Sequence, residues 1–125
     1  MRKPLSILLV IVAILFGASG DGLNDSGVKT WGHLLEALEI LSVMWLFMAF
    51  KAFTLRSGLL VLLGYVFLRV GLYDYSYNIS RGLELFYVGA SNWWDLLLSK
   101  QPPGGLLFGR IIFTIGGVGV LIKEL

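Results

Sequence analysis

The chain has 125 residues, of which 57% are hydrophobic and 14% are charged, with a formal net charge of +2. A soluble domain is on average about one quarter charged, and one of this size could not hide so much apolar surface from water. The composition therefore predicts an all-α, polytopic membrane protein with the lipid bilayer as partner. Scattered basic residues exclude a nucleic-acid surface, and the lack of cysteine excludes disulfides and thiol-bound cofactors.

The first apolar run covers residues 4–19, after a basic start and before the small residues 17–20. A basic start, an apolar run and small residues are also the parts of a secretory signal, so a cleaved signal peptide is the alternative. Because the run approaches spanning length, we interpret it as the first transmembrane helix. The polar, glycine-rich residues 21–30 predict an exposed loop, with Thr30 capping the helix that follows.

The second predicted transmembrane helix covers residues 31–53 and carries Glu36 and Glu39 in its first turns. The third covers residues 57–73, which is close to the lower limit for a span, and contains Arg69. These three charged residues lie at or inside the expected apolar layer, where an unpaired charge is energetically costly.

Residues 74–104 form the least hydrophobic stretch after the first loop, and they predict an outer interfacial segment with a short in-plane helix near residues 93–100. Tyrosine and tryptophan favour the layer between lipid and water because their rings are apolar and carry one polar tip. The aromatic residues that we assign to this layer are Tyr75, Tyr77, Tyr87, Trp93 and Trp94.

The fourth predicted helix covers residues 105–122, which completes a single transmembrane domain over residues 1–125. It is rich in glycine, and two further glycines lie seven residues apart in the third helix. Small residues let helix backbones approach closely in lipid, although glycine is also simply common in membrane helices. The helix-packing positions that we predict are Gly64, Gly71, Gly105, Gly109 and Gly116.

Charge favours an orientation with both termini in the cytoplasm, in a cell (plasma) membrane. With the N-terminus inside, the inner side holds five basic residues and one acid, and the outer side holds five basic residues and seven acids. Basic residues are enriched on the cytoplasmic side. Because the basic counts are equal, the short loops alone carry this assignment.

Four ionisable residues, Glu36, Glu39, Arg69 and Arg110, fall in the outer half of the predicted spans, and Asp74 lies near them. Since a charge at the bilayer centre costs about 2.5–3.5 kcal/mol on insertion scales, we expect both arginines to pair with these acids. A structural clamp is the favoured interpretation. The alternative is a polar site that opens to the outer face, for protons, ions or a charged partner.

No reaction chemistry is evident in the sequence. His33 lies three residues before Glu36, on the same helical face, which is half of a metal site at most. The chain has one histidine and no cysteine, so we favour an interfacial histidine and predict neither a metal nor a cofactor. No nucleophile–base arrangement stands out, and we expect no enzymatic activity.

Three hypotheses for the function follow. The first is a non-enzymatic structural or accessory subunit that packs against copies of itself or against other membrane subunits. The second is a small oligomeric channel, a holin-like pore or a transporter, with the charged residues as its outer vestibule. The third is a membrane-embedded enzyme that uses His33 and the carboxylates with a metal.

Overall fold

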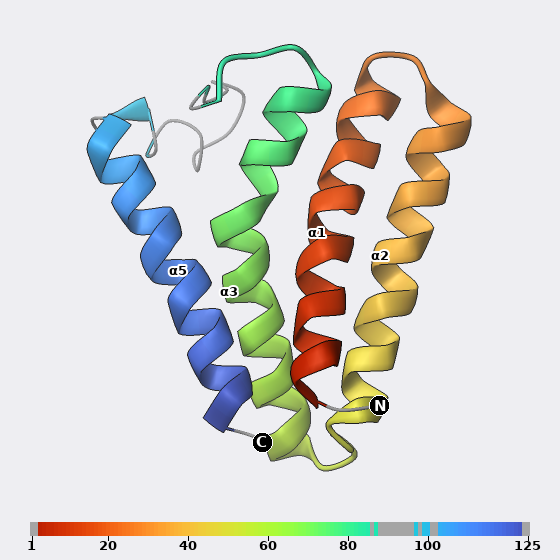
Figure 1. Ribbon diagram of the computed structural model, residues 1–125, viewed down its shortest axis with the longest axis vertical. Helices are drawn as coiled ribbons and strands as arrows, with labels where there is room; N and C mark the ends of the chain where they lie inside the picture. Colours follow the sequence, from red (N-terminus) through yellow and green to blue (C-terminus); the bar gives the residue numbers. More distant parts are fainter. Residues whose placement is uncertain (1–2, 86, 88–96, 98, 101–102, 124–125) are drawn as a thin grey trace.

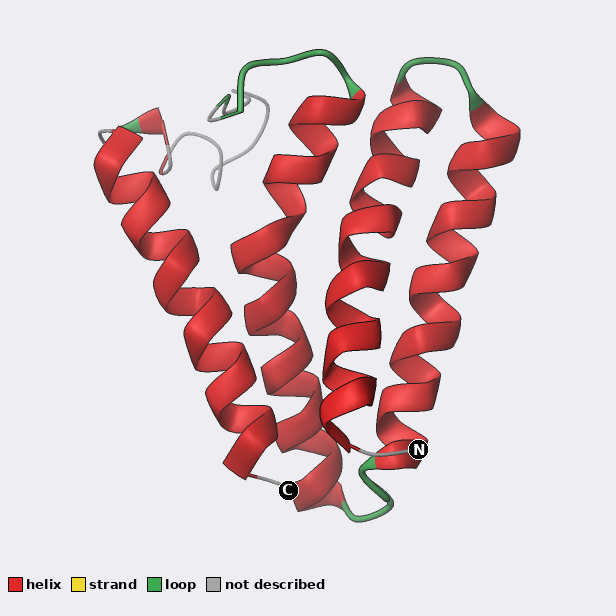
Figure 2. Ribbon diagram, in the orientation of Figure 1, coloured by secondary structure: helices red, strands yellow, loops and turns green. Residues whose placement is uncertain are grey.

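A computed structural model of the protein describes residues 3–85, 87, 97, 99–100 and 103–123. These residues form helices and loops without a strand (Figure 2). The helices are α1 (Lys3–Asp25), α2 (Lys29–Ala49), α3 (Leu55–Ser80) and α5 (Pro103–Lys123). Each is long and apolar enough to cross a membrane. At the α-helical rise they measure about 30–40 Å, against a hydrocarbon layer of about 30 Å.

The helices stand side by side in the spatial order α2, α1, α3, α5 (Figure 1). Helix α1 therefore packs on both α2 and α3, while α5 packs mainly on α3. Both chain ends and the α2–α3 turn lie at one end of the bundle, which we name the lower end. The α1–α2 turn and the end of α3 lie at the opposite, upper end.

Helix α1 continues to Asp25 and α2 begins at Lys29, so the prediction of a loop over residues 21–30 is correct only for residues 26–28. The helix stops where Gly27 adopts a positive φ of 91°. The Gly27 N–H donates to Asn24 O (3.0 Å) and the Val28 N–H donates to Leu23 O (2.8 Å). This is a Schellman motif, in which a left-handed residue closes the last turn. Hydropathy predicted the apolar part of α1, but it could not predict where the helix ends, because its last residues are polar.

Helix α2 ends at Ala49 and not at residue 53, and it ends in the same motif. Here Lys51 takes the left-handed position, with a φ of 50°. The beginning also differs from the prediction, because Thr30 lies inside the helix. The N-cap is Val28, which makes no capping hydrogen bond through its side chain.

Helix α3 begins with a capping box between Thr54 and Ser57. It extends to Ser80, so residues 74–80 are its last two turns and not part of an interfacial segment. This part of α3 is polar, but its side chains find partners on other helices. Most of residues 93–100, where we predicted a short interfacial helix, lies outside the described residues, and that helix is not shown.

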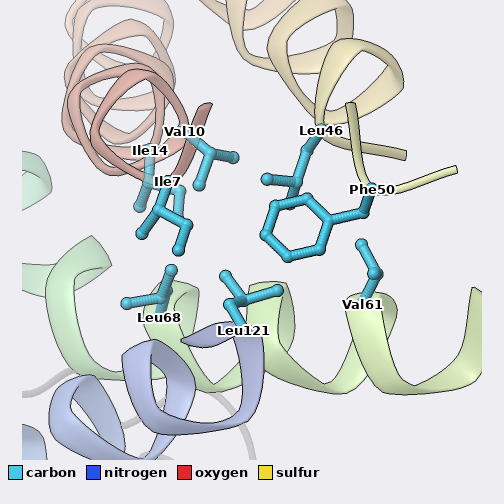
Figure 3. Packing of buried hydrophobic residues seen from close by; sticks show 8 residues of the cluster. All are labelled: Ile7, Val10, Ile14, Leu46, Phe50, Val61, Leu68 and Leu121. Carbon is cyan, nitrogen blue, oxygen red and sulfur yellow. The ribbon is translucent and has the colours of Figure 1, made fainter. Parts of the chain in front are cut away.

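Buried apolar side chains from all four helices meet in one cluster (Figure 3). We name it the apolar core cluster, and it consists of Ile7, Val10, Ile14, Leu46, Phe50, Val61, Leu68 and Leu121. Its members come from the first half of α1, from the first half and the middle of α3, from the last half of α2 and its C-cap Phe50, and from the last half of α5. The cluster therefore fills the lower and middle parts of the bundle.

Glycines set the close approach of α3 to α5. A Cβ at Gly64 would lie 2.6 Å from Leu121 Cγ, and one at Gly71 would lie 2.8 Å from the Arg110 carbonyl oxygen. Gly116 lies against the Phe67 ring. Of the other two glycines that we assigned to packing, Gly105 is exposed and Gly109 has open space where its side chain would be.

A second glycine contact joins α1 to α2. A Cβ at Gly20 would lie 2.6 Å from the Gly32 carbonyl oxygen, and one at Gly17 would overlap the Glu39 carboxyl group. Gly17 and Gly20, which belong to the small residues that also suit a signal-peptide cleavage site, are therefore contact positions of α1 against α2 in this fold. Sequence reasoning missed this role.

Candidate functional site

Five hydrogen-bond donors of α3 and its C-cap are spaced four residues apart, at Tyr65, Arg69, Tyr73, Tyr77 and, as the C-cap, Arg81. Residues four apart share one face of an α-helix, and this face points to α1 and α2. We name this set the α3 ladder. Its partners are carboxylates from α1 and α2, so the donors come from one helix and the acceptors from two others.

The innermost part of the site surrounds Glu39, which is only 6% exposed. The Tyr65 hydroxyl donates to Glu39 Oε1 at 2.7 Å, and Arg69 Nε donates to the same oxygen at 3.1 Å. The Arg69 guanidinium also lies over the Tyr73 ring, 4.4 Å from its centroid. The arginine cation and the tyrosine hydroxyl offset the energetic cost of burying this carboxylate, because a buried charge is tolerated only when it is paired and hydrogen-bonded.

One turn further along α3, Asp21 of α1 receives the next contacts. The Tyr73 hydroxyl donates to Asp21 Oδ2, and Arg69 Nη2 lies 3.8 Å from the same oxygen. Arg69 therefore bridges acids from two helices. No partner was predicted for Asp21, because we placed this residue in a loop. The four-residue spacing of the tyrosines was the signal that could have revealed it.

The ladder ends at the surface. The Tyr77 hydroxyl donates to Asp25, Arg81 Nη1 donates to the Tyr77 hydroxyl at 3.1 Å, and Arg81 lies 3.8 Å from Asp25. The hydrogen bond with Tyr77 raises the pKa of the Arg81 guanidinium above its usual value, so this end stays cationic. The whole set thus links an exposed arginine to a buried glutamate.

Glu36 lies beside the ladder and has other partners. The Asn24 side-chain amide donates to Glu36 Oε1, and His33 Nδ1 lies 3.3 Å from Glu36 Oε2. The His33 side chain is 68% exposed. Within the described residues, no group of three or more histidine or acidic side chains has the geometry to hold a metal ion.

Arg110 and Asp74 form a separate pair on another face of α3. Arg110 Nη2 donates to Asp74 Oδ2 at 2.9 Å, and the guanidinium lies 4.9 Å from the centroid of the Tyr75 ring. Asp74 follows Arg69 by five residues, which turns it by about 140° around the helix. The charged residues that the sequence placed in one cluster therefore form two ion-pair sites, one facing α1 and α2 and one facing α5.

The aromatic residues assigned to an interface are divided in the same way. Tyr77 belongs to the ladder and Tyr75 lies under Arg110. Tyr87 is tied to the end of α3, because the Asn78 side chain donates to the Leu85 and Tyr87 carbonyl oxygens at 3.0 and 3.1 Å. Trp93 and Trp94 lie outside the described residues.

A groove of about 330 Å³ opens between α2 and α3 beside the ladder. Its upper part holds three acids and one arginine, and its lower part is mainly apolar. The lining residues are Asp21, Glu36, Glu39, Ile40, Val43, Met44, Tyr65 and Arg69. Both described hydrogen bonds to the Glu39 carboxylate end on Oε1. Three acids against one arginine leave the groove with an excess of negative charge, and its chemistry suits a cation with an apolar body.

The chain matches no model of a known protein family, and neither a curated protein nor a solved structure is similar enough to count as a match.

Proposed function

We propose that the protein is a non-enzymatic, four-helix membrane protein that serves as a structural or accessory subunit of a membrane assembly. In this proposal the α2–α3 groove receives a membrane-spanning helix of a partner that carries a basic side chain. The observation that supports it most is the charge of the groove, three acids against one arginine, on helices apolar enough to cross a membrane.

The energetic reason is that hydrocarbon is a poor solvent for this groove. The Asp21 and Glu36 side chains are each 32% exposed and that of Arg69 is 39% exposed. A charge at the bilayer centre costs about 2.5–3.5 kcal/mol on insertion scales. A cationic partner helix would cover these groups and neutralise the excess charge, and the apolar side chains of Ile40 and Met44 would pack against its body.

The basic residue comes from a different protein. Lys29 begins α2 and lies about 15 Å from Glu39 along the helix axis, and Arg81 lies about 18 Å beyond Arg69 on α3. These distances exceed the length of a side chain. In a second copy inserted in the same direction, the described basic side chains nearest the depth of Glu39 are Arg69 and Arg110, and both are already paired with acids of their own chain. A homo-oligomer would therefore use another face.

Charge also supports the proposed orientation, with both termini in the cytoplasm of a cell membrane. The charged side chains described at the lower end are all basic, whereas every described acid lies within residues 21–39 or 74–84. Basic residues favour the cytoplasmic side. The basic side chains of the lower end are Lys3, Lys51, Arg56 and Lys123.

The burial of the charged residues favours a clamp and a docking groove over conduction. The ladder stops at Tyr65, and below it the apolar core cluster joins all four helices. Glu39 and Arg110 are each 6% exposed and already paired within the chain. A channel, holin-like pore or transporter needs a polar path through both halves, and these contacts give less support to that alternative.

A defined peptide tests the groove. The protein, labelled at the lower end, is placed in vesicles with a synthetic Leu/Ala-rich transmembrane peptide that carries one arginine ten residues from its outer end, and energy transfer reports association. We expect the arginine peptide to bind about tenfold more tightly than the same peptide with glutamine, which corresponds to about 1.4 kcal/mol.

The groove variant Asp21→Asn with Glu36→Gln keeps the hydrogen-bond acceptors but removes both carboxyl groups and their negative charge, so it should lose this preference. The control Glu84→Gln removes a charge at the same end but outside the groove, and it should keep the preference. Equal binding of the two peptides to the wild-type protein would contradict the proposal.

A further inference from the structure

A second groove lies at the lower end of the bundle, between α3 and α5. Its volume is about 590 Å³, and it is unrelated to the ladder. The residues that line it are Leu55, Arg56, Leu59, Leu60, Val120 and Lys123. It combines one polar rim with one apolar wall, and the proposed partner helix leaves it free.

The rim of this groove is cationic. Arg56 lies in the first turn of α3 and Lys123 ends α5, so the two helices bring their basic residues to the same end. Both side chains are exposed, and neither forms an ion pair with an acid in the part of the chain that the structure describes. Lys3 and Lys51 add positive charge to the same end. An anion is the complement of this rim.

The wall of the groove is hydrocarbon. Leu55 is 81% exposed and Leu59 is 56% exposed, and both lie beside Leu60 and Val120. Leu55 lies at the level of the cationic rim, and Leu59, Leu60 and Val120 lie about one turn further toward the middle of the helices, in the direction that an acyl chain takes below its headgroup. A free phosphate would use the rim but not this wall.

We propose that this groove binds one anionic phospholipid, with its phosphate between Arg56 and Lys123 and an acyl chain along the leucines. Basic residues near the membrane surface attract anionic lipids, and basic pockets between membrane helices hold their headgroups. The site is occupied from the leaflet that faces the lower end, which under the proposed orientation is the cytoplasmic one. The lipid fills the space between the beginning of α3 and the end of α5.

Native mass spectrometry of the full chain in a neutral detergent measures the binding. Phosphatidylglycerol and phosphatidylcholine with identical acyl chains are added separately, and the bound lipid is counted. Near a membrane surface each basic residue contributes about 1 kcal/mol, or about fivefold in affinity. We therefore expect a clear preference of the wild-type protein for phosphatidylglycerol, reduced about fivefold in Arg56→Gln and further in Arg56→Gln with Lys123→Gln.

A matched control separates the groove from general charge. The double variant Lys29→Gln with Lys51→Gln loses the same net charge at positions outside the groove. Because Lys51 adds only to the general charge of the lower end, this variant should keep most of the preference. Equal occupancy by the two lipids in the wild-type protein overturns the proposal, and so does a loss of the same size in the control.

The apolar wall has its own test. Val120→Trp fills the wall without changing any charge, so it should lower the binding of phosphatidylglycerol while the helical circular dichroism stays unchanged. Glycerol phosphate, which has the headgroup charge without acyl chains, should not displace the lipid at equal concentration. Displacement by glycerol phosphate, or full binding to Val120→Trp, overturns the assignment to a lipid and leaves an anion site only.

Discussion

The upper and lower halves of the bundle are held together by different forces. In the upper half, donors of α3 bind carboxylates of α1 and α2, and Arg110 of α5 binds Asp74. In the lower half the apolar core cluster joins the helices, and the charged side chains Arg56 and Lys123 lie at the rim of the lower groove. Polar contacts fix which residues face each other, since each donor needs its own acceptor, whereas apolar contacts and glycines set how closely the helices approach.

The largest effect is expected from removing the cation of the upper half. Arg69→Leu leaves the buried Glu39 carboxylate with the Tyr65 hydroxyl and without a counterion. Breaking a buried pair by removing one partner costs about 3 kcal/mol, so the free energy of unfolding in mixed micelles should fall by roughly that amount.

Two variants check the cause of this loss. Arg56→Leu changes an exposed arginine of the lower end and should cost little. Glu39→Gln combined with Arg69→Met removes both charges and should recover most of the stability, because no buried carboxylate remains. If the double variant is as unstable as Arg69→Leu, the ion pair is not what stabilises the upper half.

The lower half should respond to lost volume. Leu68 is fully buried in the apolar core cluster, and Leu68→Ala should cost about 2–3 kcal/mol through the cavity that it leaves. The loss should be the same at low and high salt, because no charge is involved. A salt-dependent loss would show that the two halves are not independent.

A smaller effect is expected from the glycines, and its sign should depend on position. Gly20→Ala places a methyl group against the Gly32 backbone and should lower stability by about 1–2 kcal/mol. Gly109→Ala meets open space and should be neutral or stabilising by up to about 1 kcal/mol, because alanine favours the helix. Melting temperatures in detergent measure both, and equal losses would contradict the α1–α2 contact.

The smallest effect is a gain at the lower end. Lys51 has a positive φ of 50°. In this conformation a residue with a Cβ is strained by roughly 1 kcal/mol relative to glycine. Lys51→Gly should therefore raise the melting temperature slightly. The matched change Arg56→Gly, inside the first turn of α3, should lower it.

Hydropathy alone located the four helices, because an apolar run of about 20 residues leaves few other structures. It could not locate their ends. Residues 21–25 and 74–80 are polar but helical, since Asp21, Asp25 and Asp74 bind partners on other helices. Helices α1 and α3 stop just before Gly27 and Gly82, which have a positive φ. Because glycine favours this conformation, these two positions could have been predicted from the sequence as helix ends.

The site was partly predictable. Pairing of Arg69 and Arg110 with nearby acids follows from the cost of an unpaired charge in lipid, and the structure shows Arg69 with Glu39 and Arg110 with Asp74. The division into two sites depends on the order α2, α1, α3, α5, which no single helix encodes. For the same reason Gly64 and Gly71 contact α5 while Gly109 does not.

The separation of donors and acceptors along the chain has a consequence for biosynthesis. The carboxylates Asp21 and Glu39 belong to the hairpin of α1 and α2, while Tyr65, Arg69 and Tyr73 belong to α3, which leaves the ribosome later. Until α3 arrives, the hairpin exposes uncompensated acids and is costly to bury in lipid. Newly made α1 and α2 should therefore stay near the membrane surface or beside the insertion machinery. The three helices should insert fully into the membrane once α3 has been synthesised.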